Sequence, residues 1–151
     1  TLLKKKNLNF VILRLGTIFG ISSGMRFHTA VNKFCWQASF DQEITVWKTA
    51  YNQVRPYLGI NDAARAISFI LRYNHFNSQI YNIVSENSTV RNIIEYIKLK
   101  KDVRIKFVKN KIMNQLSYGV SNKKFVDLGF NFKDRIEDGV TDTMDLLDTK
   151  K

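Results

Sequence analysis

The spacing of hydrophobic and polar residues changes along the chain between a strand-like and a helix-like period, which predicts an α/β fold. Short apolar or alternating runs predict strands over 10–15, 44–47, 54–58, 79–84 and 103–108. Apolar residues three and four apart predict helices over 29–40, from 62 to about 74, from 89 onward, in a short stretch after 121, and from 134 onward. The nearly continuous run Phe10–Leu15 suits a strand buried in a parallel sheet, and the glycine-containing segment 16–27 is predicted to be a loop.

Each predicted helix has an inward stripe and a polar residue suited to its start. A side-chain oxygen at that position can accept a bond from an unpaired backbone N–H. The candidates for this position are Thr29, Asn61 or Asp62, Ser88 or Thr89, Ser121, and Asp134 with Glu137 as a capping box. Gly129 suits the end of the short helix. The residues expected to face inward are Val31, Phe34, Cys35 and Ala38; Ala63, Ala66, Ile67, Ile70 and Leu71; Val90, Ile93, Ile94 and Ile97; and Ile136, Val140, Met144 and Leu147.

Composition places the chain among globular proteins. Its 151 residues are 44% hydrophobic, enough for one domain with a core, and we treat 1–151 as a single domain. The one cysteine, Cys35, excludes an intramolecular disulfide and a cysteine-based zinc site, and neither histidine has a metal-ligand partner at helical spacing. No apolar run approaches the roughly 20 residues of a membrane span, and no signal pattern opens the chain. We therefore expect a cytoplasmic protein with no metal and no membrane partner.

The strongest local signal for chemistry is the segment around Arg55. Gln53-Val54-Arg55-Pro56-Tyr57 predicts a short strand, and Asn61-Asp62 opens a helix directly after it. An arginine can hold a phosphate through two parallel hydrogen bonds, so Arg55 is a candidate phosphate ligand. The alternative is a surface arginine that happens to precede an ordinary helix.

Two further motifs look catalytic but have the wrong context. Tyr96 and Lys100 match Tyr-x-x-x-Lys, in which a lysine one turn on lowers the pKa of a catalytic tyrosine. Gly16, Gly20 and Gly24 follow a strand, but their spacing is not Gly-x-Gly-x-x-Gly and no helix follows at once. We expect these glycines to permit loop turns rather than to bind a dinucleotide.

The order of several segments resembles the C-terminal, substrate-binding half of the extended short-chain dehydrogenase/reductases, the NAD-dependent nucleotide-sugar epimerases and dehydratases. That family has an apolar strand ending in Leu-Arg, a loop ending in Tyr-Gly or Phe-Gly, a helix with Asn near its start, a strand of the type Leu-Thr-Val-Tyr, then Arg-x-Tyr/Phe and Asp at a helix start. The matching segments here are 10–20, 32–38, 44–47, 55–62, 81–90 and 117–130. Within the family, Ala30–Ala38 looks most like the sulfolipid-precursor (UDP-sulfoquinovose) synthase branch.

The resemblance implies a partial Rossmann-type sheet with a small mixed α/β substrate-binding domain. It also implies roles in nucleotide-sugar binding for Arg55 at the diphosphate, for Asn32 and Lys33 at the diphosphate or sugar, for Thr45, Val46 and Trp47 at the base, and for Thr17 near the sugar. Asn32 and Lys33 could instead lie in a solvated first turn, and Trp47 in the core. Many relatives carry Asn where Thr17 stands. The segment 115–118 lacks the Arg that many relatives place there.

Two functional motifs of the family do not occur in their expected places in this chain. The glycine-rich NAD loop is absent, and the catalytic Tyr-x-x-x-Lys of the family would fall before Thr1. We therefore expect the C-terminal half of a larger enzyme that uses NAD or NADP, with a nucleotide-sugar, UDP-sugar favoured, as its ligand. This chain alone is expected to have no catalytic or cofactor-binding residues, to be inactive, and to form a homo-oligomer.

Two alternatives to that expectation stay open. One is a nucleotide-sugar-binding or regulatory module that never catalyses. The other is a basic nucleic-acid-binding domain, because the net charge is +11 and the pI is about 9.8. The basic residues are scattered over short clusters rather than gathered on one helix face. That distribution argues against nucleic acid as a partner.

Overall fold

The computed structural model describes residues 6, 8–109 and 117–149. In chain order its elements are β1 (Ile12–Leu15), β2 (Thr17–Phe19), α2 (Ala30–Ser39), β3 (Ile44–Trp47), the 3-10 helix η1 (Lys48–Ala50), β4 (Val54–Gly59), α3 (Ile60–Arg72), β5 (Ile80–Ile83), β6 (Glu86–Thr89), α4 (Val90–Lys100), β7 (Ile105–Val108), α5 (Lys123–Val126) and α6 (Ile136–Asp148). The predicted α/β class is confirmed. None of the helices in these ranges is long and apolar enough to cross a membrane.

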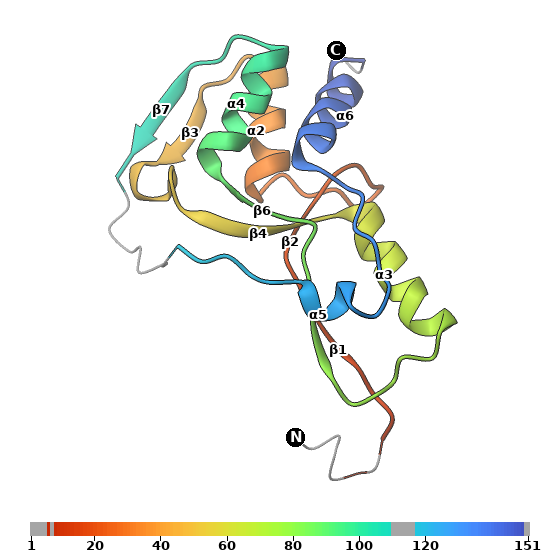
Figure 1. The fold of residues 1–151 in the computed structure, drawn as a ribbon. Helices are drawn as coiled ribbons and strands as arrows, with labels where there is room; N and C mark the ends of the chain where they lie inside the picture. Colours follow the sequence, from red (N-terminus) through yellow and green to blue (C-terminus); the bar gives the residue numbers. More distant parts are fainter. Residues whose placement is uncertain (1–5, 7, 110–116, 150–151) are drawn as a thin grey trace.

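Three of the four strand pairs are parallel. β1 pairs with β5, β2 with β4, and β3 with β7, while β4 and β6 are antiparallel. In Figure 1, β4 and β6 run across the middle of the molecule, with α2, α4 and α6 gathered at one end beside β3 and β7. β1, β5, α3 and α5 occupy the other end. Parallel pairs require long crossover connections, and these are supplied by the helices.

The larger core lies among α2, α4 and α6. Every inward residue predicted for these three helices is buried there, together with Ile44 and Val46 of β3 and Phe19 of β2. Cys35 is among them, and burial raises the pKa of its thiol to about 12. The helical spacing of apolar residues therefore placed this core correctly.

The smaller core, between α3, α5 and the β1–β5 pair, corrects one prediction. Ala63, Ala66 and Ile70 of α3 are buried against it, with Phe125 and Phe130. Ile67 and Leu71 were predicted on the same stripe, but they are 48% and 63% exposed. Their positions form a second apolar face of α3, rotated away from the sheet, which the described residues do not cover.

Two short strands were not predicted. β2 lies within the segment expected to be a loop, and its register against β4 runs from Thr17 opposite Tyr57 to Phe19 opposite Gly59. β6 is a polar strand, and it pairs because β4 lies beside it rather than because of its own sequence. β1 is less buried than predicted, since Arg14 and Leu15 are exposed and β5 is its only neighbour among the described strands.

The structure confirms some of the predicted N-caps and not others. Thr89 caps α4 by accepting a bond from the Asn92 N–H, as predicted. Thr29 precedes α2 but makes no capping bond through its side chain. The short helix α5 begins after Asn122 rather than Ser121, whose hydroxyl accepts a weaker bond from the Lys123 N–H. Gly129 follows this helix with a φ of +96°, as its predicted role requires.

The predicted caps of α3 and α6 were wrong. α3 begins after Gly59, so Asn61 and Asp62 lie inside its first turn. α6 begins after Arg135, and its first N–H, that of Ile136, donates to Glu86 rather than to a capping box. Asp134 instead accepts a bond from the backbone N–H of Asp62, 2.8 Å away. Tertiary partners compete successfully with local capping here.

Candidate functional site

A cavity of about 270 Å³ lies between the start of α2 and strands β3 and β4. Its lining comprises Thr17, His28, Ala30, Lys33, Phe34, Thr45, Val46, Trp47, Ala50, Gln53, Arg55, Tyr57 and Val90. Six of the seven residues predicted to bind a substrate are in this set. They come from four elements that are separated along the sequence, β2, α2, β3 and β4, and the fold brings them to one place.

Arg55 reaches the cavity from β4. Its guanidinium donates to the carbonyl of Val54 at 2.9 Å and to Oε1 of Gln53 at 2.8 Å, and it lies 5.1 Å from the ring centre of Tyr118. These contacts orient the side chain while it stays half-buried. A guanidinium held in place loses less side-chain entropy when it takes hold of a phosphate.

Of the two residues predicted to bind the ligand at the start of α2, Lys33 lines this cavity and Asn32 does not. Lys33 lines the cavity and is half-buried. Asn32 is 4% exposed, and its side-chain amide is used within the protein. Its Oδ1 accepts from the Gly20 N–H, and its Nδ2 donates to the Arg26 carbonyl. Asn32 therefore holds the 20–29 loop against α2 and lies at a neighbouring cavity.

Strand β3 forms one wall. Trp47 is 46% exposed at the end of this strand, so its ring offers a flat face to a ligand, whereas Val46 is buried. The Ile44 N–H donates to Arg104 on the β7 side, so alternate residues Thr45 and Trp47 turn their backbone groups away from β7. The Thr45 N–H donates to Oε1 of Gln37. The Thr45 N–H is therefore used within the protein, and the Trp47 ring is the group that this wall offers to a ligand.

The lining includes residues that the sequence did not single out, chiefly His28, Gln53 and Tyr57. Tyr57 stands two residues after Arg55, so the pleat of β4 places both on one face of the strand, and that spacing was a usable signal. Burial raises the pKa of Tyr57 to about 12, although the Arg55 charge opposes this shift. Its hydroxyl therefore stays protonated and can donate a hydrogen bond.

Residues 2–84, more than half of the chain, match the model of the NAD dependent epimerase/dehydratase family. This chain belongs to that family. A curated relative is the trifunctional UDP-glucose 4,6-dehydratase/UDP-4-keto-6-deoxy-D-glucose 3,5-epimerase/UDP-4-keto-L-rhamnose-reductase of Arabidopsis thaliana. It is 28% identical over 99 residues, which are 62% of this chain and 15% of the relative.

Solved structures share the fold of this epimerase/dehydratase-family chain. UDP-glucuronic acid 4-epimerase from Bacillus cereus, in complex with UDP-glucuronic acid and NAD, superimposes with a TM-score of 0.84 at 20% identity, over 99% of this chain. UDP-glucose 4-epimerase from Thermus thermophilus, in complex with NAD, superimposes with a TM-score of 0.79 at 21% identity, over 96% of this chain. The chain spans 48% of the length of each of these two structures.

The segment that contains Gly16, Gly20 and Gly24 does not form a dinucleotide-binding loop. Gly20 has a φ of +106° in a turn after β2, and the next helix begins only at Ala30. A backbone carbonyl of β4 lies close to Gly16, so that position serves strand packing. This arrangement is not the strand–loop–helix unit that holds a dinucleotide phosphate. Nor do the described residues contain a group of His, Cys, Asp or Glu side chains that could hold a metal ion.

The Tyr-x-x-x-Lys match in α4 has no catalytic geometry. Lys100 forms an ion pair with Asp145 of α6, with an N–O distance of 2.7 Å. Burial, followed by the charges of Glu86 and Glu137, raises the pKa of Tyr96. A catalytic tyrosine of this kind needs a lowered pKa, whereas the surroundings of Tyr96 raise its pKa.

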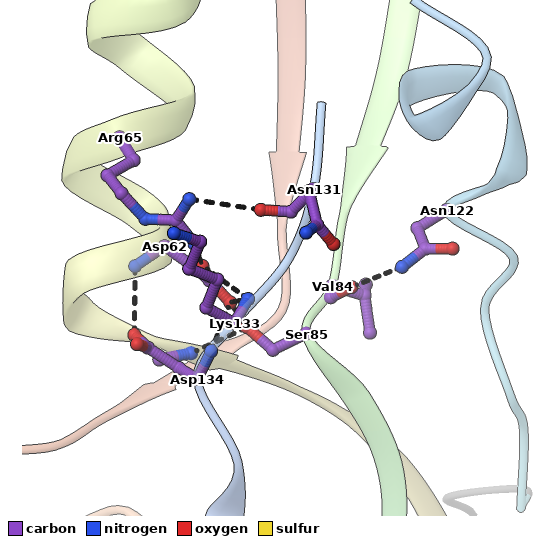
Figure 2. Close-up of polar contacts among 9 residues, drawn as sticks. Asp62, Arg65, Val84, Ser85, Asn122, Asn131, Lys133 and Asp134 are labelled. Atoms are coloured by element: carbon purple, nitrogen blue, oxygen red, sulfur yellow. Dashed lines mark hydrogen bonds and ion pairs between the residues drawn. The ribbon is translucent and has the colours of Figure 1, made fainter. Parts of the chain in front are cut away.

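A buried carboxylate links α3 to the end of β4 and to the segment that precedes α6. Asp62 has no exposed surface, and Figure 2 shows it among Arg65, Ser85, Lys133 and Asp134. It accepts bonds from the backbone N–H groups of Lys133 and Asp134, from the Ser85 hydroxyl and from the Arg65 guanidinium. Ser85 in turn accepts from the Gly59 N–H, at the end of the strand that carries Arg55. Asp62 thereby fixes β4 from its far end.

Proposed function

We propose that this chain is the nucleotide-sugar-binding part of an NAD- or NADP-dependent epimerase or dehydratase, with a UDP-sugar as its ligand. The observation that carries the proposal is the convergence of Thr17, Lys33, Thr45–Trp47 and Arg55 on one cavity. None of the described residues that line this cavity is acidic, whereas three have basic side chains. A nucleoside diphosphate suits such a surface because its diphosphate needs cations and its base needs a flat apolar face.

The proposed binding mode follows the order of the lining residues. Arg55 and Lys33 hold the diphosphate, because they are cations from two different walls of the cavity. Trp47 receives the base, and Thr17 lies toward the sugar. Tyr57, two residues after Arg55 on the same face of β4, donates a hydrogen bond to the ligand.

Solved structures that share this fold and contain a UDP-sugar support the proposal. The Bacillus cereus epimerase was solved with UDP-glucuronic acid and NAD, and a UDP-glucose 4-epimerase of Thermotoga maritima with UDP-glucose. Since the chain spans about half of such structures, we propose that NAD or NADP binding and turnover require further protein. This chain alone would then retain no NAD(P) and show no turnover. The sulfolipid-precursor branch stays a prediction that rests on Ala30–Ala38.

The test is calorimetric titration of the chain with UDP and with UDP-glucose. We expect both to bind, and Arg55→Ala to weaken both about 10- to 100-fold, because a lost charge-assisted hydrogen bond costs about 1.5–3 kcal/mol. Arg72→Ala is the matched control, since Arg72 is an exposed arginine at the end of α3 and does not line the cavity. Equal affinity of the wild type and Arg55→Ala would overturn the proposed role of Arg55.

A further proposal concerns association between copies of the chain. β1 is paired on one edge by β5, and within the described residues its other edge has no strand beside it. An open edge of an apolar strand is a template for another chain. We propose a homo-oligomer that pairs through this edge.

A further inference from the structure

The segment 117–122, which leads into α5 (Figure 1), has no regular secondary structure, yet side-chain hydrogen bonds hold it against the strands. Asn87 of β6 makes two bonds to one residue of this segment. Its Oδ1 accepts from the Val120 N–H at 2.8 Å, and its Nδ2 donates to the Val120 carbonyl at 3.0 Å. Asn82 and Asn122 add one side-chain bond each nearer to α5. Asn87 therefore does for Val120 what the backbone of a neighbouring strand would do.

The beginning of the same segment contacts the strand that carries Arg55. The Tyr118 N–H donates to the Val54 carbonyl at 3.1 Å, and the Ser117 hydroxyl accepts from the Val54 N–H at 2.9 Å. Val54 directly precedes Arg55 in β4. The ring of Tyr118 lies against the Arg55 side chain, with its centre 5.1 Å from the guanidinium carbon. The segment therefore contacts β4 through its backbone and Arg55 itself through a ring.

The contact with the Tyr118 ring restrains the Arg55 guanidinium without neutralising it. An aromatic face attracts a cation through the quadrupole of the ring, and unlike a carboxylate it brings no opposite net charge. Tyr118 is 52% exposed, and neither Tyr118 nor Asn87 is among the described residues that line the cavity. The route from these two residues to a ligand in the cavity therefore runs through Arg55.

We propose that Tyr118 and Asn87 are positioning residues for Arg55, the proposed ligand of the diphosphate. The inference rests on the proposed function, because it concerns the residue that holds the diphosphate there. Asn87 fixes Val120, the fixed segment holds Tyr118, and the Tyr118 ring keeps the Arg55 guanidinium in one orientation. An arginine that is restrained before binding gives up less side-chain entropy when it takes hold of a phosphate, so the ligand binds more tightly.

The first part of the experiment is calorimetric titration of single variants with UDP. We expect Tyr118→Ala to weaken UDP binding about two- to fivefold, the range for a partly exposed cation–aromatic contact. Tyr118→Phe keeps the ring and loses only the hydroxyl, so it should bind UDP like the wild type. Asn87→Ala should weaken UDP about twofold or more but no more than Tyr118→Ala, because the bonds to Val54 still hold the beginning of the segment.

The second part repeats Tyr118→Ala and Asn87→Ala in a chain that already carries Arg55→Ala. If both residues act through Arg55, neither change should weaken UDP binding further in that background. A direct contact with the ligand, or a general loss of structure, would instead lower the affinity by the same factor with and without Arg55. The double-mutant cycle therefore separates positioning from these two explanations.

Two exposed residues near the other end of the molecule supply matched controls. Tyr73 is 58% exposed and its ring packs on Phe69, and the Asn77 side chain donates to the Tyr81 hydroxyl. Neither Tyr73 nor Asn77 lines the cavity or contacts the segment 117–122 through these bonds. Tyr73→Ala and Asn77→Ala should therefore bind UDP like the wild type.

Three results would overturn the inference and leave the proposed function standing. The first is wild-type affinity in Tyr118→Ala or Asn87→Ala while Arg55→Ala weakens UDP. The second is an equal loss in Tyr118→Phe and Tyr118→Ala, since that assigns the effect to the hydroxyl. The third is a loss that persists in the Arg55→Ala background. Absence of UDP binding by the wild type would overturn the proposed function itself, and the inference with it.

Discussion

At the scale of single residues, Asp62 shows how a buried charge can join distant segments. Its carboxylate accepts from two backbone N–H groups more than 70 residues away and from Ser85. Asp134 returns the contact by accepting from the Asp62 N–H, so each aspartate satisfies the backbone of the other. A carboxylate without exposed surface is tolerated because these donors replace the water it has lost.

We expect Asp62→Asn to destabilise the protein by about 3 kcal/mol, because an amide has one acceptor oxygen where the carboxylate has two and leaves buried donors unpaired. Urea unfolding followed by circular dichroism measures the change. Asp127→Asn is the matched control. Asp127 pairs with Lys123 at the surface, where both side chains are more than half exposed, and such pairs contribute about 0–1 kcal/mol. Similar losses in the two variants would contradict the role assigned to Asp62.

At the scale of elements, the close approach of α6 to β2 depends on Gly139. A Cβ at this position would lie 2.5 Å from the ring of Phe19, which is 2% exposed in the larger core. Glycine inside a helix normally weakens it by about 1 kcal/mol relative to alanine. Gly139 therefore lets α6 pack against β2, although glycine lowers the helix propensity of this segment.

Gly139→Ala tests which of these two effects is larger. We expect a net loss of about 1–2 kcal/mol of unfolding free energy, since a methyl group forced into a packed core costs about 1–3 kcal/mol. Thermal and urea unfolding measure the change. Gly24→Ala provides the comparison, because a Cβ there would meet no atom within 4 Å and should be nearly neutral. A stabilised Gly139→Ala variant would mean that Phe19 moves aside easily.

At the scale of the whole molecule, the two ends differ in how completely the apolar faces predicted for their helices are covered. The end with α2, α4 and α6 buries the apolar face predicted for each helix. The end with β1 and α3 leaves Leu15, Ile67 and Leu71 exposed, at 45%, 48% and 63%. The net charge of +11 opposes contact between copies, but salt screens it over about 8–10 Å. Association should therefore involve the β1 end and tighten as salt is added.

Light scattering at increasing protein and salt concentration tests this expectation. We expect a dimer or larger species, and Leu15→Lys should shift it toward monomer, because a charge on an edge strand blocks pairing. Leu99→Lys adds the same charge at an apolar residue of α4 that is 76% exposed, and it should leave the association unchanged. A strictly monomeric wild type at high concentration would contradict the proposed pairing through β1.

Local pattern was sufficient for some features of this protein. The periodicity of α2, α4 and α6 identified their buried faces, because helix geometry maps a spacing of three and four directly onto one side. The order of Thr17, Lys33, Thr45–Trp47 and Arg55 pointed to residues that line one cavity, because segment order along this fold is shared with relatives. The sequence by itself therefore determined the fold class and most of the core, and it pointed to six of the thirteen described residues that line the candidate cavity.

Tertiary structure decided the rest, where a residue had two locally reasonable partners. Asp134 had a capping-box partner in sequence, but its carboxylate binds the backbone of Asp62 in α3. Asn32 suited a ligand at a helix start, but its amide holds the 20–29 loop. Ile67 and Leu71 had the spacing of a buried stripe, but α3 is packed on one side only. In each case the outcome depends on which distant segment lies within hydrogen-bonding or packing distance, and spacing along one segment does not contain that information.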